Sequence, residues 1–335
     1  MRSSILRAIV FSAAATIPAI AQTSDEPVVA FVAGTTLNLA APSGKITQKI
    51  DVKNPIYSFA LSKDRKLLVT VSADTATGGN LYLLNLQTHA QARLTNGHLY
   101  FKTKDLDKDE TEVYDDPQFS PDGLSLVFAI HTDNPGDGND AINDSGPIAV
   151  MNLRTRKVRV LKSTENIGGE GLCFANTPKW SPDGKWILFN CESGAFITDV
   201  AGTTIRELKL GTEANTIAYA TSWVGNSCVL TVRNIEVQPD NKESDEILLF
   251  NPHTSKSGSP ATLFSSPKWA VSGLIEASES VFIQRSDSGI SIETNEMTWS
   301  FPEIQREFKE RLSWRASAAH IIGGWHPLSI PQECK

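Results

Sequence analysis

After residue 21 the sequence contains no apolar run that could span a bilayer as a helix, which needs about 20 apolar residues. Its four cysteines form no Cys-x-x-Cys pair, which argues against a zinc site or a thioredoxin-like redox site. The Gly-x-Ser-x-Gly, His-Glu-x-x-His and phosphate-loop motifs are also missing. We therefore assign no catalytic residue and no cofactor-binding residue.

Positive charge is in the minority. The chain has 31 Lys and Arg residues against 38 Asp and Glu residues, which gives a formal net charge of −7. Loss of Arg2 and Arg7 with the N-terminal segment lowers it to −9. An acidic chain lacks the electrostatic footprint of a nucleic-acid binder. We expect no nucleic-acid partner and no membrane span, and we expect a monomer.

The N-terminus has the order of features found in a secretory signal peptide. Arg2 and Arg7 precede the apolar residues 8–17, and the small residues 19–21 follow. We predict a signal peptide at residues 1–21, cleaved near Ala21, and a periplasmic or secreted mature protein. The alternatives are a buried N-terminal segment and an uncleaved membrane anchor, for which the apolar run is short.

A repeat runs along the mature chain, residues 22–335. Residues 117–129 and 178–190 match in register as Pro, an aromatic residue, Ser-Pro-Asp-Gly and an apolar strand. A degraded copy lies at residues 57–71, and weaker ones centre on residues 223–226 and 267–269. Ser, Pro and Gly at these positions favour a tight turn, and the apolar flanks favour two strands. A third strand and a short basic fourth strand, as at residues 157–162, complete a four-stranded unit.

The Ser-Pro-Asp-Gly hairpin, followed by Ile-Leu-Phe-Asn and Phe-Ile-Thr-Asp-Val-Ala-Gly at residues 187–202, resembles the propeller repeat of TolB and its relatives. The copies cover the mature chain almost end to end, but the α/β domain that precedes the propeller in TolB is missing. The resemblance therefore implies the blade fold and does not imply membership of the Tol–Pal envelope system.

The repeats predict an all-β fold, a six-bladed β-propeller of four-stranded antiparallel blades in a single domain. Five blades are expected at residues 56–95, 115–162, 177–210, 217–264 and 267–302. Residues 28–50 resemble the last three strands of a blade, and residues 319–326 resemble a first strand. Their union in a sixth blade would close the ring and remove open sheet edges. The alternative is an unrelated C-terminal tail. Residues 303–313 have a helical pattern and predict one peripheral helix.

Two acidic stretches are candidates for a metal site. Residues 105–116 lead into the second of these blades, and residues 133–144 interrupt it. Loops that enter a blade and loops between its second and third strands emerge on the same face, so we expect the two stretches to be neighbours. Alternating carboxylates suit calcium, although neither stretch is a complete EF-hand. The alternative is a solvated acidic loop pair without a metal. The candidate ligands are Asp105, Asp107, Asp109, Asp133, Asp137 and Asp144.

Two function classes follow from this sequence. The first is a non-enzymatic module that binds a protein or a glycan through loops on one face of the propeller. The second is a propeller enzyme, a polysaccharide lyase or glycoside hydrolase with carboxylates at the channel mouth, because one fold hosts unrelated chemistries. A purely structural or sensor role is a third possibility.

The cysteines flank one of the repeat turns. Cys173 and Cys191 lie at similar distances from the turn at residues 182–184, so antiparallel pairing predicts a disulfide between them. An exported location would keep this bond oxidised. A bond between Cys228 and Cys334 would require the C-terminal tail to cross the fifth blade, and we leave that pairing open.

Overall fold

The computed structural model describes residues 29–33, 35–40, 46–52, 54, 56, 58–64, 66–74, 78–97, 99–100, 111–133, 142–165, 176–191, 194–208, 216–224, 228–237, 242–252, 261–266, 270–277, 280–286, 298–299 and 326–329. Their side chains are described mainly between residues 35 and 208. The predicted signal peptide at residues 1–21 and the predicted helix at residues 303–313 lie outside these ranges.

The described residues form six β-sheets, which we number I to VI. Sheet I contains β1 (Val29–Ala33), β2 (Thr36–Ala40), β3 (Ile46–Asp51) and β22 (Thr298–Trp299). Sheet II contains β4 (Ser58–Leu61), β5 (Leu67–Asp74), β6 (Gly78–Asn85) and β7 (Gln91–Arg93). Sheet III contains β8 (Thr111–Phe119), β9 (Ser125–Asp133), β10 (Ile142–Asn152) and β11 (Val158–Val160).

The second half of the chain continues the pattern. Sheet IV contains β12 (Asn176–Trp180), β13 (Trp186–Cys191), β14 (Gly194–Asp199) and β15 (Ile205–Leu208). Sheet V contains β16 (Thr216–Val224), β17 (Cys228–Val237), β18 (Lys242–Phe250) and β19 (Ala261–Ser266). Sheet VI contains β20 (Ala270–Ala277), β21 (Ser280–Ser286) and β23 (His326–Ser329).

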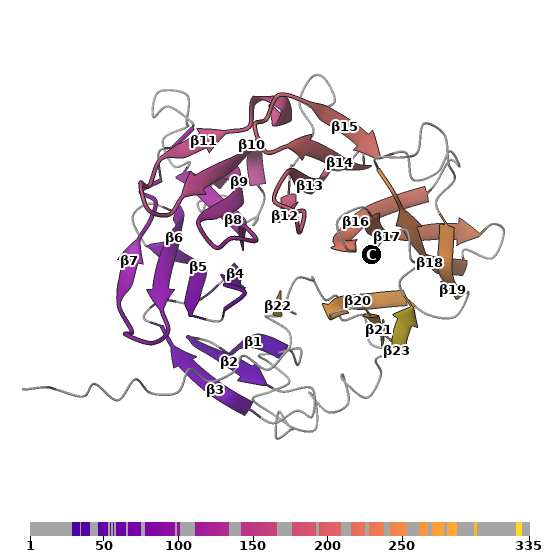
Figure 1. Cartoon of the computed structure of the whole chain (residues 1–335), viewed down its shortest axis with the longest axis horizontal. Helices are drawn as coiled ribbons and strands as arrows, with labels where there is room; N and C mark the ends of the chain where they lie inside the picture. The colour runs from indigo at the N-terminus through magenta and orange to yellow at the C-terminus, as the bar shows by residue number, and fades with distance from the viewer. Residues whose placement is uncertain are drawn as a thin grey trace, which may run out of the picture.

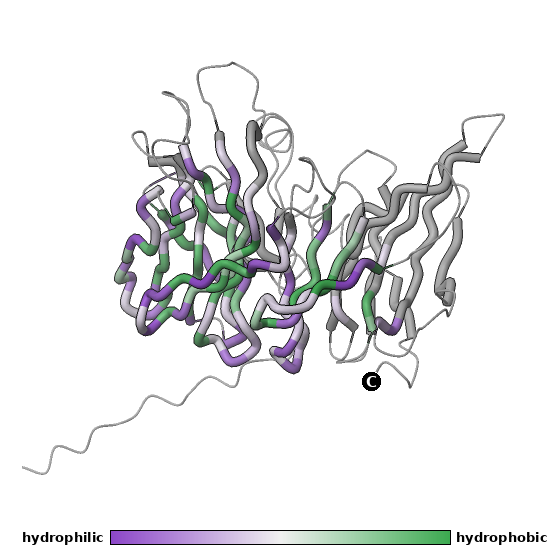
Figure 2. Tube along the Cα trace, turned by 90° about the horizontal axis from the view of Figure 1, so that it is seen from above, coloured by the Kyte–Doolittle hydropathy of each residue, from purple (hydrophilic) through white to green (hydrophobic). Residues whose placement is uncertain are grey.

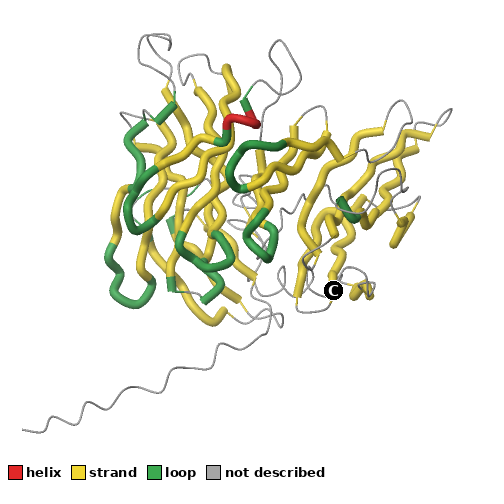
Figure 3. The backbone as a smooth tube through the Cα atoms, turned by 45° about the horizontal axis from the view of Figure 1, so that its top comes forward, coloured by secondary structure: helices red, strands yellow, loops and turns green. Residues whose placement is uncertain are grey.

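The six sheets follow one another around a common centre, and β22, β4, β8, β12, β16 and β20 lie nearest to it (Figure 1). Strands dominate the described chain, and its one helical piece is the 3-10 turn Lys162–Thr164 (Figure 3). No helix in these residues has the length and apolar character needed to cross a membrane. The predicted all-β repeat is therefore confirmed.

The Ser-Pro-Asp-Gly turns have the hydrogen bonds that their sequence predicts. In sheet IV the Ser181 hydroxyl donates to Asp183 Oδ1 at 2.7 Å and accepts the Trp186 N–H at 2.9 Å. Gly184, the last residue of the motif, has a φ of +72°, a conformation that favours glycine. The equivalent turn of sheet III repeats these contacts around Ser120. The motif therefore fixes the hairpin between the two inner strands of a sheet.

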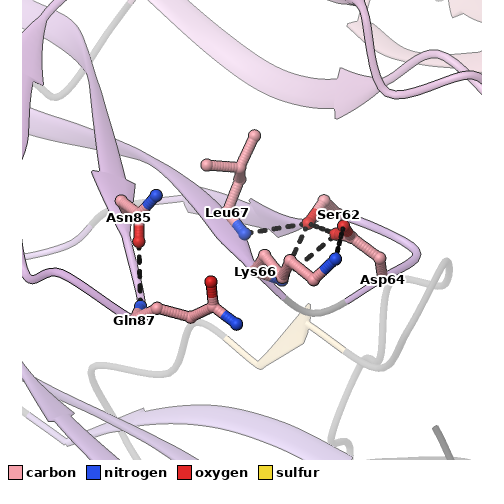
Figure 4. Close-up of polar contacts among 6 residues, drawn as sticks. All are labelled: Ser62, Asp64, Lys66, Leu67, Asn85 and Gln87. Carbon is pink, nitrogen blue, oxygen red and sulfur yellow. Dashed lines mark hydrogen bonds and ion pairs between the residues drawn. The ribbon is translucent and has the colours of Figure 1, made fainter. Parts of the chain in front are cut away.

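Sheet II keeps this turn although its sequence has lost the proline and the glycine (Figure 4). The Ser62 hydroxyl donates to Asp64 Oδ1 at 2.7 Å and accepts the Leu67 N–H at 2.9 Å. Lys66 adds an ion pair with Asp64 at 3.3 Å. The serine and the aspartate are thus sufficient to specify the turn, which explains why a weak sequence copy still marks a blade.

Hydrophobic clusters fill the space between consecutive sheets rather than one central core. Sheets II and III share a cluster in which Val69 and Leu81 meet Tyr114 and Phe128. Similar clusters join sheets I and II, sheets III and IV, and sheets IV and V. A sheet with a neighbour on each side therefore has both faces buried. This accounts for continuous apolar runs such as residues 126–130 of sheet III. In Figure 2 the hydrophobic residues follow the strands and hydrophilic ones gather at the turns.

The segment that meets the N-terminal strands is not the one predicted. Thr298–Trp299 lies beside β1, in the position predicted for residues 319–326, and it pairs with β1 in parallel, with Phe31 opposite Trp299. The C-terminal strand β23 instead pairs antiparallel with β21, with Val281 opposite Leu328. In that position it supplies backbone partners to an edge of β21 that would otherwise be open.

Sheet VI also departs from the predicted blade at residues 267–302. It has three strands among the described residues, and its first hairpin closes at Ala277 and Ser280 rather than at the weak motif copy of residues 267–269. That copy lacks the serine and the aspartate that specify the other turns. The four preceding blades have their strands within a few residues of the predicted bounds.

Both described cysteines, Cys191 and Cys228, are disulfide-bonded. Cys173 and Cys334 lie outside the described residues, so the pairing of Cys173 with Cys191 stays a prediction.

The turn aspartates make stability depend on acid in a defined direction. A hydrogen bond from the Ser120 hydroxyl and then one from the Leu124 N–H lower the pKa of Asp122 below the usual value of an aspartate. A carboxyl whose folded pKa is depressed stabilises the fold above its unfolded pKa, and this contribution disappears as the pH falls through the folded pKa. We therefore expect Asp122→Asn to lower the melting temperature at pH 6.

The difference in melting temperature between wild type and Asp122→Asn should shrink as the pH falls from about 5 towards the folded pKa of this group. Thermal melts of both proteins, from pH 6 down to the lowest pH at which both still fold, measure this difference. A difference that stays constant over this range would contradict the assigned role of the Asp122 charge.

Candidate functional site

The two acidic stretches attach to adjacent strand ends of sheet III. Thr111, the first residue of β8, pairs with Asp133 at the end of β9. Asp133 in turn pairs with Ile142, the first residue of β10. The strand ends that flank residues 101–110 and residues 134–141 therefore lie side by side at one end of the sheet.

The candidate metal ligands are only partly placed. Asp105, Asp107, Asp109 and Asp137 lie outside the described residues. Asp133 and Asp144 lie on β9 and β10, but their side chains are not described. Within the side chains that are described, no group of three or more His, Cys, Asp and Glu residues could hold a metal ion. The six-residue calcium set therefore stays a prediction.

Glu112 anchors the chain just before the first acidic stretch. This side chain is fully buried on β8, and its carboxylate accepts the Leu99 N–H at 2.8 Å and the Tyr100 N–H at 3.0 and 3.1 Å. The sequence placed Glu112 in an acidic loop. Its spacing of two from Tyr114 on a strand is the signal that it shares the buried face of that residue. Glu112 thus holds the connection between sheets II and III.

Two tyrosines lie close to this anchor. Burial and then the negative charge of Glu112 raise the pKa of Tyr114, so its phenol stays neutral. Tyr100 is about one-third exposed, and its pKa is raised by burial and by the neighbouring carboxylate of Glu165. Glu165 follows the 3-10 turn after β11, so Tyr100 links the segments that enter and leave sheet III. It is an exposed aromatic residue on the face that carries the acidic stretches.

The inner strands of sheets III and IV carry matching β-bulges. The register shifts between Asp115 and Gln118 in β8, and between Asn176 and Lys179 in β12. In each bulge the residue before a proline has a positive φ, 48° at Asp116 and 47° at Thr177. This backbone conformation is uncommon for residues other than glycine, and for a β-branched threonine it is an outlier. The surrounding structure must therefore hold these two residues in place.

Hydrogen bonds between neighbouring sheets provide that support. They use side chains or backbone groups of the inner strands: Thr177 N–H to Asp116 Oδ2 at 2.9 Å, Trp180 N–H to Gln118 Oε1 at 2.6 Å and Trp223 Nε1–H to the Lys179 carbonyl at 3.1 Å. The Thr177 hydroxyl also accepts a bond from Asn190 Nδ2 at 2.8 Å. The polar side chains of the two bulges are thus engaged in joining sheets III, IV and V.

The buried His131 lies close enough to the half-buried Asp115, next to the bulge of sheet III, to feel its charge. His131 is 3% exposed, and its Nδ1 atom has no hydrogen-bond partner. Burial lowers the pKa of His131, and the negative charge of Asp115 partly opposes that change. The imidazole is therefore neutral at pH 7. Since it is enclosed between sheets, direct contact with a large substrate would require the sheets to move.

Loss of the Glu112 carboxylate tests its anchoring role. In Glu112→Ala the two N–H groups of Leu99 and Tyr100 would lose their acceptor, which costs about 2–4 kcal/mol of unfolding free energy. The change should also make the connection at residues 99–110 more sensitive to limited proteolysis. Urea unfolding and a protease time course measure the two effects. Glu207→Ala, which removes an exposed carboxylate, is the control and should stay within about 0.5 kcal/mol of wild type. Equal stability of both variants would refute the anchor.

No protein-family model matches the sequence, and no curated protein matches it significantly. Solved structures do. A putative TolB from Agrobacterium tumefaciens is 16% identical, aligns over 72% of this chain and 80% of its own, and gives a TM-score of 0.43. TolB from Acinetobacter baumannii is 19% identical over 82% of this chain and 65% of its own, with a TM-score of 0.47.

A prolyl endopeptidase structure is 13% identical over 75% of this chain and 36% of its own, with a TM-score of 0.50. The present chain thus spans little more than a third of that protein. The expected TolB-like propeller fold is confirmed, and identities this low show the fold alone.

Proposed function

We propose that the protein is an exported, non-enzymatic binding module, a closed six-bladed propeller that binds a protein or a glycan at the face carrying its acidic stretches. The observation that supports this most directly is the division of polar groups in sheet III. Asp116 and Gln118 of the inner strand are bonded to sheet IV, whereas the strand ends that flank residues 101–110 and residues 134–141 lie together at one end of the sheet. Recognition by loops on a rigid scaffold is the usual arrangement in binding proteins.

Two observations support the closed ring and the exported location. The pairing of β22 with β1 brings residues from near both ends of the chain into one sheet, which would leave the ring without an open gap. The disulfide-bonded Cys191 and Cys228 favour an oxidising compartment, in agreement with the signal-peptide pattern of residues 1–21.

Calcium is part of the proposal. Asp105, Asp107, Asp109, Asp133, Asp137 and Asp144 would supply the hard oxygen ligands that calcium prefers. The ion would order two mutually repelling acidic segments and shape the face that binds the ligand. Extracellular calcium modules commonly work at about 10⁻⁴–10⁻³ M calcium, so the site would be filled outside the cytoplasm.

The enzyme alternative, a polysaccharide lyase or glycoside hydrolase, has one candidate pair among the described residues. His131 has a lowered pKa beside Asp115, an environment found in general bases. Its burial argues against it, because a catalytic base must reach the proton that it removes. A prolyl endopeptidase shares the fold, but the nucleophile motif of such enzymes is missing from this sequence.

Removal of the closing strand tests the ring. Deletion of residues 298–335 removes β22 and β23, and it should expose the edges of β1 and β21. We expect a lower melting temperature and aggregation in size-exclusion chromatography. A chain that ends at residue 318 keeps β22 and is the control, since it exposes only β21. Equal melting temperatures for the full-length protein and both deletions would refute the closure.

Calcium dependence tests the binding face. A cation that binds only the folded state raises stability with the logarithm of its concentration over its dissociation constant. We expect millimolar calcium to raise the melting temperature above that in chelator, and magnesium to do so less, because its octahedral geometry is stricter. Asp137→Asn should reduce the calcium effect, whereas Glu207→Gln should not. Identical melts in calcium, magnesium and chelator would leave a solvated acidic surface without a metal.

The same variants separate binding from catalysis. Immobilised wild-type protein should retain a ligand from periplasmic extract in calcium and release it in chelator, and Asp137→Asn should retain less than Glu207→Gln. Incubation with acidic and neutral polysaccharides should produce no new reducing ends or unsaturated uronates. Depolymerisation that is lost in His131→Gln would overturn the binding proposal in favour of the enzyme.

A further inference from the structure

Sheet III carries a second charged surface, which we call the basic rim: Arg154, Arg156, Lys157, Arg159 and Lys162. It comprises the turn between β10 and β11, β11 itself and the start of the 3-10 turn. All five residues are exposed, and no acidic residue occurs between residues 150 and 164. The turn lies at the opposite end of β10 from the acidic stretches. In an acidic chain, the basic rim is therefore a local reversal of charge.

No carboxylate neutralises the basic rim in the part of the chain that the structure describes. Arg156 Nη1 donates to the Arg93 carbonyl of sheet II at 2.6 Å. Arg159 Nη2 donates to the Val200 carbonyl of sheet IV. The Arg154, Lys157 and Lys162 side chains form no hydrogen bond or ion pair in that part. Two guanidinium groups are thus held in place, and most of their five N–H donors remain for a ligand.

The stability of the fold does not account for so many positive charges. Arg206 of sheet IV makes the same kind of contact as Arg159, to the Pro252 carbonyl of sheet V. It occupies the equivalent position, since it pairs with Ile197 as Arg159 pairs with Val150. In sheet IV, however, the residue after this arginine is Glu207, and a single arginine makes the contact with the next sheet. The other positive charges of the basic rim are additional to this requirement.

We propose that the basic rim binds an anionic glycan, a polysaccharide that carries carboxylate, sulfate or phosphate groups. Segments rich in Lys and Arg bind linear polyanions, and guanidinium groups match planar oxyanions bidentately. Residues 150–164 contain no aromatic side chain, and aromatic anchors are typical of protein interfaces. The same lack of aromatic side chains leaves the basic rim without a platform on which nucleic-acid bases could stack. This site goes beyond the proposed function, because its turn lies at the other end of β10 from the acidic stretches and it needs no calcium.

Binding to immobilised heparin and polygalacturonate, with neutral dextran as a third matrix, tests the basic rim. The variant Arg154→Gln/Lys157→Gln removes two charges and leaves the contacts of Arg156 and Arg159 intact. The matched control Lys49→Gln/Lys63→Gln removes two exposed positive charges from sheets I and II. Each Lys or Arg beside an anionic surface strengthens binding about 5.5-fold. The first variant loses two such charges and should therefore bind about thirtyfold more weakly. The control should bind like wild type, and binding should weaken with salt. All arms are run in chelator, so that failure of the calcium site does not affect them.

Several results would overturn the proposal. They are equal retention of wild type on heparin, polygalacturonate and dextran, equal binding of both double variants, and tighter binding to duplex DNA or to anionic lipid vesicles than to either glycan. The charges of the basic rim could instead protect the edge strand β11 from aggregation. In that case Arg154→Gln/Lys157→Gln would aggregate in size-exclusion chromatography. Arg154→Lys/Lys157→Arg, which keeps both charges, should bind the glycans like wild type, and its failure to do so would also count against the site.

Discussion

The hydrogen bond from the Thr177 N–H to the Asp116 carboxylate joins two inner strands at their bulges, and the arrangement of the sheets depends on contacts of this kind. Apolar clusters fill the space between sheets, but hydrophobic contact has no direction and does not fix how one sheet is rotated on the next. A hydrogen bond between a bulge and the backbone of the next sheet has a direction, and it does fix this rotation. It also holds two backbone conformations that would otherwise be strained.

This constraint limits which polar groups of sheet III remain for the proposed ligands. Asp116 and Gln118 act as structural acceptors, so the inner surface of sheets III and IV has fewer unoccupied polar groups than its sequence suggests. Glu112 is likewise used internally, to hold the segment before the first acidic stretch. Groups that remain for ligands lie at the ends and on the outer edge of sheet III. The acidic stretches and the basic rim occupy these places, so one blade presents both signs of charge on separate surfaces.

Local sequence predicted the parts of the fold that depend on local hydrogen bonds. The turn at Ser181 and its degraded copy at Ser62 form the same contacts, because a serine and an aspartate are sufficient. The pairing of β22 with β1 and of β23 with β21 could not be predicted from the sequence. Both strands are short, and their partners are distant in the chain. The burial of Glu112 was hidden for a related reason. Its neighbours are acidic, and its spacing of two from Tyr114 is a signal of burial only once residues 111–119 are known to form a strand. The bonds to Leu99 and Tyr100 then show that it is part of the fold.

Amide hydrogen exchange at Thr177 is the most direct test of the contact between the inner strands. Asp116→Gly removes the carboxylate and keeps a residue that accepts a positive φ. A hydrogen bond to a charged group contributes about 1.5–3 kcal/mol, so the Thr177 N–H should exchange about tenfold to a hundredfold faster in the variant. The Trp186 N–H, bonded to Ser181 within sheet IV, should keep its rate. An unchanged exchange rate at Thr177 would contradict the claim that the bulges hold the sheets together.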